Sequence, residues 1–86
     1  MYYVYVIQNP DSRFYIGCTD DVNRRLENHN TGISTWTRYR GPWTLIWQKK
    51  FQSLGEARIF ENLLKRQKGG KGFTSLTGIP LPPSRS

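Results

Sequence analysis

The sequence has few cysteines, few acidic residues and no long hydrophobic run, and each shortage excludes a class of protein. Cys18 is the only cysteine among the 86 residues, so neither an internal disulfide nor a cysteine-based zinc cluster can form. No apolar stretch approaches the roughly 18 residues that a membrane-spanning helix needs. The chain opens directly on a strand-like segment without a signal-peptide pattern. We therefore expect one small, soluble, cytoplasmic domain.

Acidic side chains are outnumbered, because 6 of them accompany 13 lysines and arginines and leave a formal charge of +7. The imbalance is confined to one half of the chain. Residues 1–35 hold 3 basic and 4 acidic side chains, whereas residues 36–86 hold 10 and 2. Basic charge gathered in one half indicates a polyanionic partner, most often a nucleic acid. A basic protein without such a partner is the alternative.

Aromatic residues are plentiful, and near the amino terminus they indicate a β-hairpin. Residues 2–8 are aromatic and β-branched without a breaker, which predicts a strand. Residues 9–13 combine Asn, Pro, Asp and Ser, which favour a tight reversal. Residues 14–19 are then predicted to form the return strand.

The register of this hairpin decides which side chains share a face. If Gln8 lies opposite Phe14, Tyr5 lies opposite Gly17 and diagonal to Tyr15, on the same face. A slip by one residue would send the two tyrosines to opposite faces. We favour the first register, because Gly17 has no side chain and would leave space between the two phenols.

A helix is predicted over residues 22–30, with an N-cap supplied by residues 19–21. Four residues with helical spacing share one of its faces: Val22, Arg25, Leu26 and His29. Because the aliphatic pair must face the sheet, Arg25 and His29 lie on or beside the buried stripe, where a charge requires a partner. Gly32 suits the loop after the helix, although it is late for a strict C′ position.

A polar, aromatic and basic loop is expected over residues 33–42, followed by a third strand over residues 43–51. Alternation along this strand places Trp43, Leu45 and Trp47 on one face and Ile46 on the other.

A second helix is predicted from about residue 54 to residue 68. Ser53 and Glu56 form a capping box at its start. Its apolar stripe contains Ala57, Phe60, Leu63 and Leu64. Glu61 borders that stripe. Residues 73–76 are expected to add one short turn against the core, and residues 78–86, with three prolines, to form a flexible tail. The predicted domain therefore spans residues 1–77 and belongs to the α+β class.

The two tripeptides of the hairpin, Tyr3-Val4-Tyr5 and Tyr15-Ile16-Gly17, resemble those of the GIY-YIG nuclease superfamily. Arg25, ten residues after Tyr15, and His29, four later, stand where the family has its arginine and its helical histidine or tyrosine. Glu61 stands in the helix after the third strand. The resemblance covers residues 2–68. The chain most resembles small single-domain bacterial members of the family and the nuclease domain of enzymes that cut branched DNA. The resemblance implies a small three-stranded antiparallel sheet flanked by helices.

The resemblance implies a divalent-metal-dependent endonuclease, with five catalytic residues: Tyr5, Tyr15, Arg25, His29 and Glu61. By resemblance, Glu61 binds Mg²⁺ or Mn²⁺. A single protein ligand is sufficient for such an ion, because the ion keeps several water ligands. The alternative for Glu61 is a partly buried ion pair with Arg25. Tyr3 and Cys18 depart from the family pattern. Relatives carry glycine at the position of Tyr3, and some of them carry lysine at the position of Cys18.

The chemistry assigns a role to each side chain. The guanidinium of Arg25 would hold the scissile phosphate, while the preceding Arg24 suits a surface salt bridge. Tyr5 would be the general base or position the water, which requires positive charge nearby because a free phenol has a pKa of about 10. Tyr15 would orient water or phosphate, and His29 would relay the proton from Tyr5. Cys18 is explained by packing.

DNA is the expected partner, and its contacts are predicted in the basic half of the chain. The candidate nucleic-acid-binding residues are Trp36, Arg38, Arg40, Lys65, Arg66, Lys68 and Lys71. Stacking of Trp36 or Tyr39 on an unpaired base would favour branched or single-stranded DNA, and a partner protein would add specificity. Two alternatives are a non-catalytic nucleic-acid-binding module with this fold and a structural protein in which the aromatic residues only pack.

Overall fold

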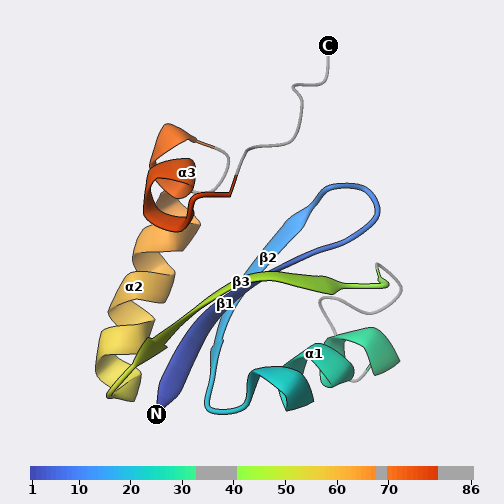
Figure 1. Cartoon of the computed structure of the whole chain (residues 1–86), viewed down its shortest axis with the longest axis horizontal. Helices are drawn as coiled ribbons and strands as arrows, with labels where there is room; N and C mark the ends of the chain where they lie inside the picture. The colour runs from blue at the N-terminus through green and yellow to red at the C-terminus, as the bar shows by residue number, and fades with distance from the viewer. Residues whose placement is uncertain (33–40, 68–69, 80–86) are drawn as a thin grey trace.

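A three-stranded antiparallel sheet carries helices on both of its faces (Figure 1). The computed structural model describes residues 1–32, 41–67 and 70–79. The strands are β1 (Tyr2–Gln8), β2 (Phe14–Thr19) and β3 (Thr44–Phe51), arranged in the order β2-β1-β3. The helices are α1 (Val22–Thr31), α2 (Leu54–Gln67) and α3 (Lys71–Thr77). The predicted α+β class and the three-stranded antiparallel sheet are confirmed.

The hairpin turn is organised by the side chain of Asn9, which is buried. Its Oδ1 accepts the main-chain N–H of Asp11 at 3.1 Å and that of Arg13 at 2.9 Å. Asparagine favours turns because its side chain can bond main-chain groups nearby. Ser12 adopts a positive φ of 63° within this turn, so the reversal is completed without a glycine.

The favoured hairpin register is confirmed. Gln8 pairs with Phe14, and Tyr5 pairs with Gly17. A Cβ atom built on Gly17 would overlap the Tyr5 hydroxyl and lie 2.8 Å from Tyr5 Cε1. Glycine is therefore required at position 17 because the Tyr5 ring occupies the space that a side chain would fill.

The strands contribute side chains to two separate hydrophobic cores, because successive side chains point to opposite faces of the sheet. The α2-side core buries Val4, Val6, Phe14, Ile16, Ala57, Leu64 and Phe73. The α1-side core buries Tyr5, Ile7, Val22 and Trp43, with Tyr3, Tyr15, Leu26 and Leu45 packed against it. Figure 1 shows α2 and α3 on one face of the sheet and α1 on the other.

Strand β3 carries a bulge that the sequence pattern did not reveal. Its pairing with β1 shifts between Val6, which pairs with Trp47, and Ile7, which pairs with Leu45. The extra residue breaks the alternation of faces. Leu45 consequently packs with the α1-side core, whereas Ile46 and Trp47 pack with the α2-side core. The expectation that Leu45 and Trp47 share a face opposite to Ile46 is therefore wrong.

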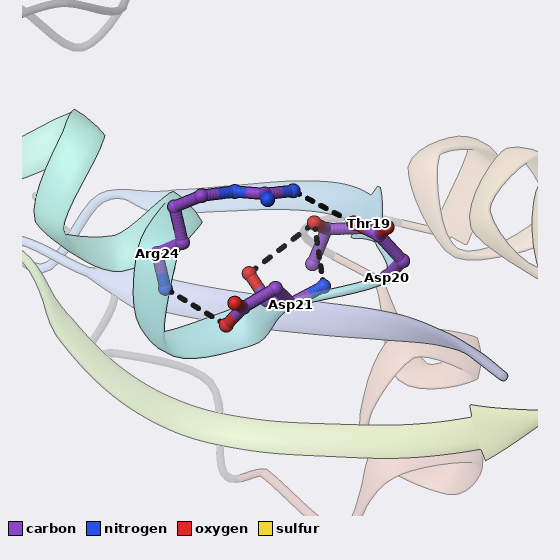
Figure 2. Close-up of polar contacts among 4 residues, drawn as sticks. All are labelled: Thr19, Asp20, Asp21 and Arg24. Carbon is purple, nitrogen blue, oxygen red and sulfur yellow. Dashed lines mark hydrogen bonds and ion pairs between the residues drawn. The ribbon is translucent and has the colours of Figure 1, made fainter.

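Helix α1 begins where the sequence predicts, because residues 19–21 cap it (Figure 2). Asp21 Oδ1 accepts the main-chain N–H of Arg24 at 3.1 Å. The Thr19 hydroxyl accepts the N–H of Asp21 at 3.1 Å and donates to its carbonyl at 3.3 Å. The Arg24 guanidinium reaches back to Asp20 at 2.8 Å, which confirms Arg24 as the surface ion-pair partner.

The remaining helix ends follow known capping chemistry. Gly32, at φ 83°, is itself the C-cap of α1 and donates its N–H to the Asn28 carbonyl, so its position is not late. Ser53 Oγ accepts the N–H of Glu56 at 3.2 Å, which confirms the predicted cap of α2. Phe73 of α3 is fully buried and stacks on Phe14 at 5.1 Å between ring centroids.

The predicted apolar stripe of α2 is partly correct. Ala57 and Leu64 are fully buried, and Phe60 is half-buried and stacks on Trp47. Leu63, in contrast, is 38% exposed and lies outside the core. None of the helices in the described ranges is both long and apolar enough to cross a membrane. Residues 33–40 of the loop predicted over residues 33–42, and residues 80–86 of the predicted tail, lie outside the described residues.

Candidate active site

Three elements bring four of the predicted catalytic side chains together on the α1 face of the sheet. Tyr5 comes from β1, Tyr15 from β2, and Arg25 and His29 from α1. Ring centroids are 6.4 Å apart for Tyr5 and Tyr15, 5.9 Å for Tyr5 and His29, and 4.7 Å for Tyr15 and His29. The hairpin register and the helical spacing together produce this cluster, because each places its pair of side chains on the inner face.

A buried hydrogen bond joins Tyr5 to His29. The Tyr5 hydroxyl and His29 Nε2 are 2.8 Å apart, and the two residues are 1% and 2% exposed. Burial, reinforced by the charge of Arg25, lowers the pKa of His29 to about 4. The imidazole is consequently neutral at physiological pH. Arg25 donates toward the Tyr5 oxygen, so we assign the Tyr5 proton to the bond with Nε2 and the ring proton of His29 to Nδ1.

Tyr5 is a protonated phenol in this environment. Burial raises its pKa to about 12, although the hydrogen bond and the positive charge of Arg25 act in the opposite direction. The prediction that positive charge would stand beside Tyr5 is correct in geometry. Desolvation nevertheless outweighs that charge, because a phenolate loses more on burial than the guanidinium restores. Tyr5 therefore acts as a hydrogen-bond donor and acceptor rather than as a free phenolate.

Arg25 faces both phenols. Hydrogen bonding with Tyr5 is the largest of the effects that raise its pKa, followed by the interactions with Tyr15. The Nε atom is buried and has no hydrogen-bond partner among the described residues. A guanidinium presents a fork of donors that matches a phosphate. Arg25 thus interacts with two neutral phenols, and within the described ranges it forms no ion pair with a carboxylate.

Glu61 lies on α2, which packs on the face of the sheet opposite to α1. Its side chain is 16% exposed and forms an ion pair with Lys65 at 3.0 Å. The alternative pairing with Arg25 is not the one observed. Burial is the main cause of the raised pKa of Tyr5 and of Cys18, and the negative charge of Glu61 acts in the same direction. Glu61 is therefore electrostatically coupled to the β1–β2 hairpin, although α2 also covers the α2-side core.

The described residues contain no cluster of three or more histidine, cysteine or acidic side chains that could hold a metal ion. A dedicated protein cage for zinc or calcium is accordingly absent from the described ranges. Glu61 does fit Mg²⁺ or Mn²⁺, since a hard cation of this kind accepts one carboxylate, several waters and substrate phosphate oxygens. Its partial exposure leaves room for those waters.

Cys18 has the environment of a packing residue. It is half-buried beside the α2-side core, and burial raises the pKa of its thiol. A raised pKa keeps the thiol protonated, so Cys18 is a poor nucleophile. Its side chain also cannot reproduce the positive charge of a lysine.

The predicted nucleic-acid-binding residues fall into two groups. Lys65 and Arg66 are exposed in the last turn of α2, and Lys71 is the first residue of α3. The others lie outside the described residues: Trp36, Arg38, Arg40 and Lys68. Lys65 already neutralises Glu61, which the sequence reading did not foresee.

Asn30 is the residue that the sequence reading missed. Its side-chain amide bonds both main-chain polar groups of Trp43, at 3.0 Å and 2.6 Å. Trp43 is buried, at 3% exposed, and its ring contacts Tyr15. No periodicity reveals such a pair, because the partners become neighbours only when α1 packs beside the start of β3.

Comparisons with known proteins agree with this geometry. A family model described as the GIY-YIG catalytic domain matches residues 1–73. A UPF0213 protein of Streptococcus pneumoniae serotype 4 is 46% identical over 67 residues, which cover 77% of this chain and 68% of that protein. One from Streptococcus agalactiae serotype V is 42% identical over 66 residues, covering 76% and 75%.

A solved structure gives the same result. The solution NMR structure of a UPF0213 protein from Bacillus halodurans matches with a TM-score of 0.57 and 37% identity, covering 93% of this chain and 89% of that chain. The name UPF0213 states no activity. The family match extends over the hairpin and α1, which carry the clustered side chains, and over β3 and α2. The chain therefore belongs to the GIY-YIG family of nucleases.

Proposed function

We propose that the protein is a divalent-metal-dependent endonuclease that hydrolyses phosphodiester bonds in DNA and selects branched structures. One observation carries the proposal: the buried Tyr5 hydroxyl lies within hydrogen-bond distance of a neutral histidine, and an arginine faces the same hydroxyl. Packing alone does not require this set, because a buried guanidinium nitrogen without a hydrogen-bond partner is costly. Phosphodiester hydrolysis uses all three groups.

The pair of Tyr5 and His29 provides a path for a proton. A water molecule that donates to the Tyr5 oxygen loses a proton to that oxygen as it attacks phosphorus, and Tyr5 passes its own proton to His29 Nε2. The acceptor is available because the lowered pKa of His29 keeps the ring neutral. Tyr5 stays uncharged throughout, which suits its buried position. Tyr5 thus acts through His29 and needs no free phenolate.

Arg25 and Tyr15 serve the phosphate. The guanidinium of Arg25 binds the scissile group and stabilises the charge that develops on its oxygens. Tyr15, edge-on to His29 and within reach of Arg25, orients the phosphate or the attacking water. Neither residue transfers a proton in this assignment.

Glu61 would hold the Mg²⁺ or Mn²⁺ ion. When bound, the ion supplies Lewis-acid polarisation of the phosphate and lowers the pKa of a coordinated water. The ion pair of Glu61 with Lys65 must open or widen for this. Lys65 is then free to meet the DNA backbone, so one carboxylate and one ammonium group exchange partners when metal and DNA bind.

Binding of DNA is assigned to the basic half of the chain. Lys65 and Arg66 stand exposed at the end of α2, and contacts from Trp36, Arg38, Arg40, Lys68 and Lys71 would extend this surface. Phosphate contacts give affinity without sequence reading, so selection of flaps or junctions would follow DNA shape, base stacking or a partner protein. The proposed catalytic unit is residues 1–77, and the proposed location is the cytoplasm.

The test is cleavage of labelled linear, flap, four-way-junction and single-stranded DNA with Mg²⁺ or Mn²⁺. Wild type is compared with Glu61→Ala, and with Glu56→Ala as a matched control for an exposed glutamate on the same helix. We expect metal-dependent cutting that Glu61→Ala abolishes and Glu56→Ala retains, with DNA binding kept by both. Binding without cleavage by the wild-type protein would favour a non-catalytic nucleic-acid-binding module.

A further inference from the structure

The side-chain amide of Asn30 forms hydrogen bonds with both main-chain polar groups of Trp43. Asn30 Nδ2 donates to the Trp43 carbonyl at 3.0 Å, and Trp43 N donates to Asn30 Oδ1 at 2.6 Å. The two residues are 13 positions apart. One side chain thus satisfies both main-chain groups of the residue that precedes β3, as a neighbouring strand would. The end of α1 is thereby tied to the start of the third strand (Figure 1).

Two ring contacts connect this pair of hydrogen bonds with the candidate active site. The Trp43 ring lies edge-on to Tyr15, with centroids 6.3 Å apart at 66°. Tyr15 in turn lies edge-on to His29, at 4.7 Å and 60°. His29 precedes Asn30 in α1. A displacement of Asn30 from Trp43 would therefore be transmitted through the Trp43 and Tyr15 rings to the contact between Tyr15 and His29.

The main chain passes close to this tie. A Cβ atom built on Gly41 would lie 3.3 Å from Asn30 Oδ1 and 3.3 Å from Trp43 Cδ1. Those separations are tight for a carbon contact. The small residue at position 41 lets the main chain lie against the amide, and this restricts the movement of Asn30 and Trp43.

We propose that Asn30 is a positioning residue, whose amide sets the place of Trp43 and thereby the place of Tyr15 against His29 and Tyr5. The proposal rests on the nuclease function proposed above and extends it. Asn30 touches no reacting atom. It acts through Trp43, because its two hydrogen bonds hold both main-chain polar groups of that residue.

The test compares Asn30→Ala with Asn23→Ala, a matched control at an exposed position of the same helix. For Asn30→Ala we expect kcat to fall by about 10-fold or more and KM to change by less than about 2-fold, as for misplaced catalytic groups. We also expect the NMR pKa of His29 to rise toward the ordinary value of about 6.5, because the site loosens and admits water. His29 is the only histidine, so its signal is unambiguous. Asn23→Ala should change neither quantity.

The NMR measurement separates the two proposals, since it does not depend on activity. If the wild type cuts no DNA but Asn30→Ala still shifts the His29 pKa, the positioning role stands and the nuclease function fails. Wild-type kcat and wild-type His29 pKa in folded Asn30→Ala would overturn the positioning role. If Asn30→Ala does not fold, Asn30→Asp replaces it, because that variant keeps the acceptor for Trp43 N and loses only the donor. A folded Asn30→Asp protein with wild-type kcat would then overturn the proposal.

Discussion

The two faces of the sheet differ in the kind of residue that they bury. Among the described residues, the buried members of the α2-side core are aliphatic, alanine or phenylalanine side chains, and Phe73 and Leu64 are fully buried in it. The α1-side core adjoins a tyrosine hydroxyl, an imidazole and a guanidinium. Apolar burial stabilises a fold, whereas polar burial costs free energy unless each group is bonded. The raised pKa of Tyr5 and the lowered pKa of His29 reflect this free-energy cost, because burial disfavours the charged form of each group. We infer that one face supplies stability and the other supplies chemistry.

The largest expected effect is on catalysis from the α1 face. Tyr5→Phe removes the hydroxyl that connects to His29 and keeps the ring. Loss of such a proton path should lower kcat by about 10² to 10⁴-fold. Tyr2→Phe is the matched control, since Tyr2 lies on the same strand and packs on the α2 side. Single-turnover cleavage measures both variants, and equal losses in the two would contradict the division between the faces.

The largest expected effect on stability comes from the α2 face. Leu64→Ala should lower the free energy of unfolding by about 2 to 5 kcal/mol, because Leu64 is fully buried. The neighbouring Leu63→Ala should cost less than about 1 kcal/mol, because Leu63 is 38% exposed. Urea denaturation measures this difference. Cleavage per folded molecule should be unchanged in both variants; a specific loss of activity in folded Leu64→Ala would show that the faces are not independent.

A pH-dependent loss of stability should come from the α1 face. The pKa of His29 is about 4 in the folded protein, against about 6.5 when unfolded. The unfolded state therefore binds more protons between these values, so stability falls as the pH drops from about 6.5 toward 4. Linkage gives a loss of about 2 kcal/mol by pH 5.

The measurement is urea denaturation at pH 7 and pH 5 for wild type and His29→Gln. The variant should lose the part of the pH dependence that belongs to position 29. An equal fall of stability in the two proteins would contradict the lowered pKa.

The smallest effect is expected at the start of α1. Asp21→Ala removes the side chain that caps the Arg24 N–H (Figure 2) and should cost about 1 kcal/mol. Asp20→Ala removes only an exposed ion pair with Arg24 and should cost about 0.5 kcal/mol or less. Thermal denaturation of both variants at low and high salt distinguishes them, since only the ion pair is strongly screened. A larger loss for Asp20→Ala would contradict the assigned cap.

Much of the fold followed from local signals. The hairpin strands, the register of Tyr5 with Gly17, the caps at Asp21 and Ser53 and the buried turn at Phe73 were all predicted correctly. Strand alternation and side-chain capping act over a few residues, so the pattern contains them. The faces of β3 were mispredicted, because a bulge depends on pairing with β1 and leaves no mark in the periodicity.

The sequence by itself determined that two tyrosines, an arginine and a histidine would meet, because a two-residue period and a helical spacing each place them on one face. Only the tertiary structure decided what state they adopt. Burial keeps the Tyr5 phenol protonated and His29 neutral, and the amide of Asn30 joins α1 to Trp43 across the fold. Both depend on how completely water is excluded and on contacts between segments far apart in the chain, which no local pattern of residues records.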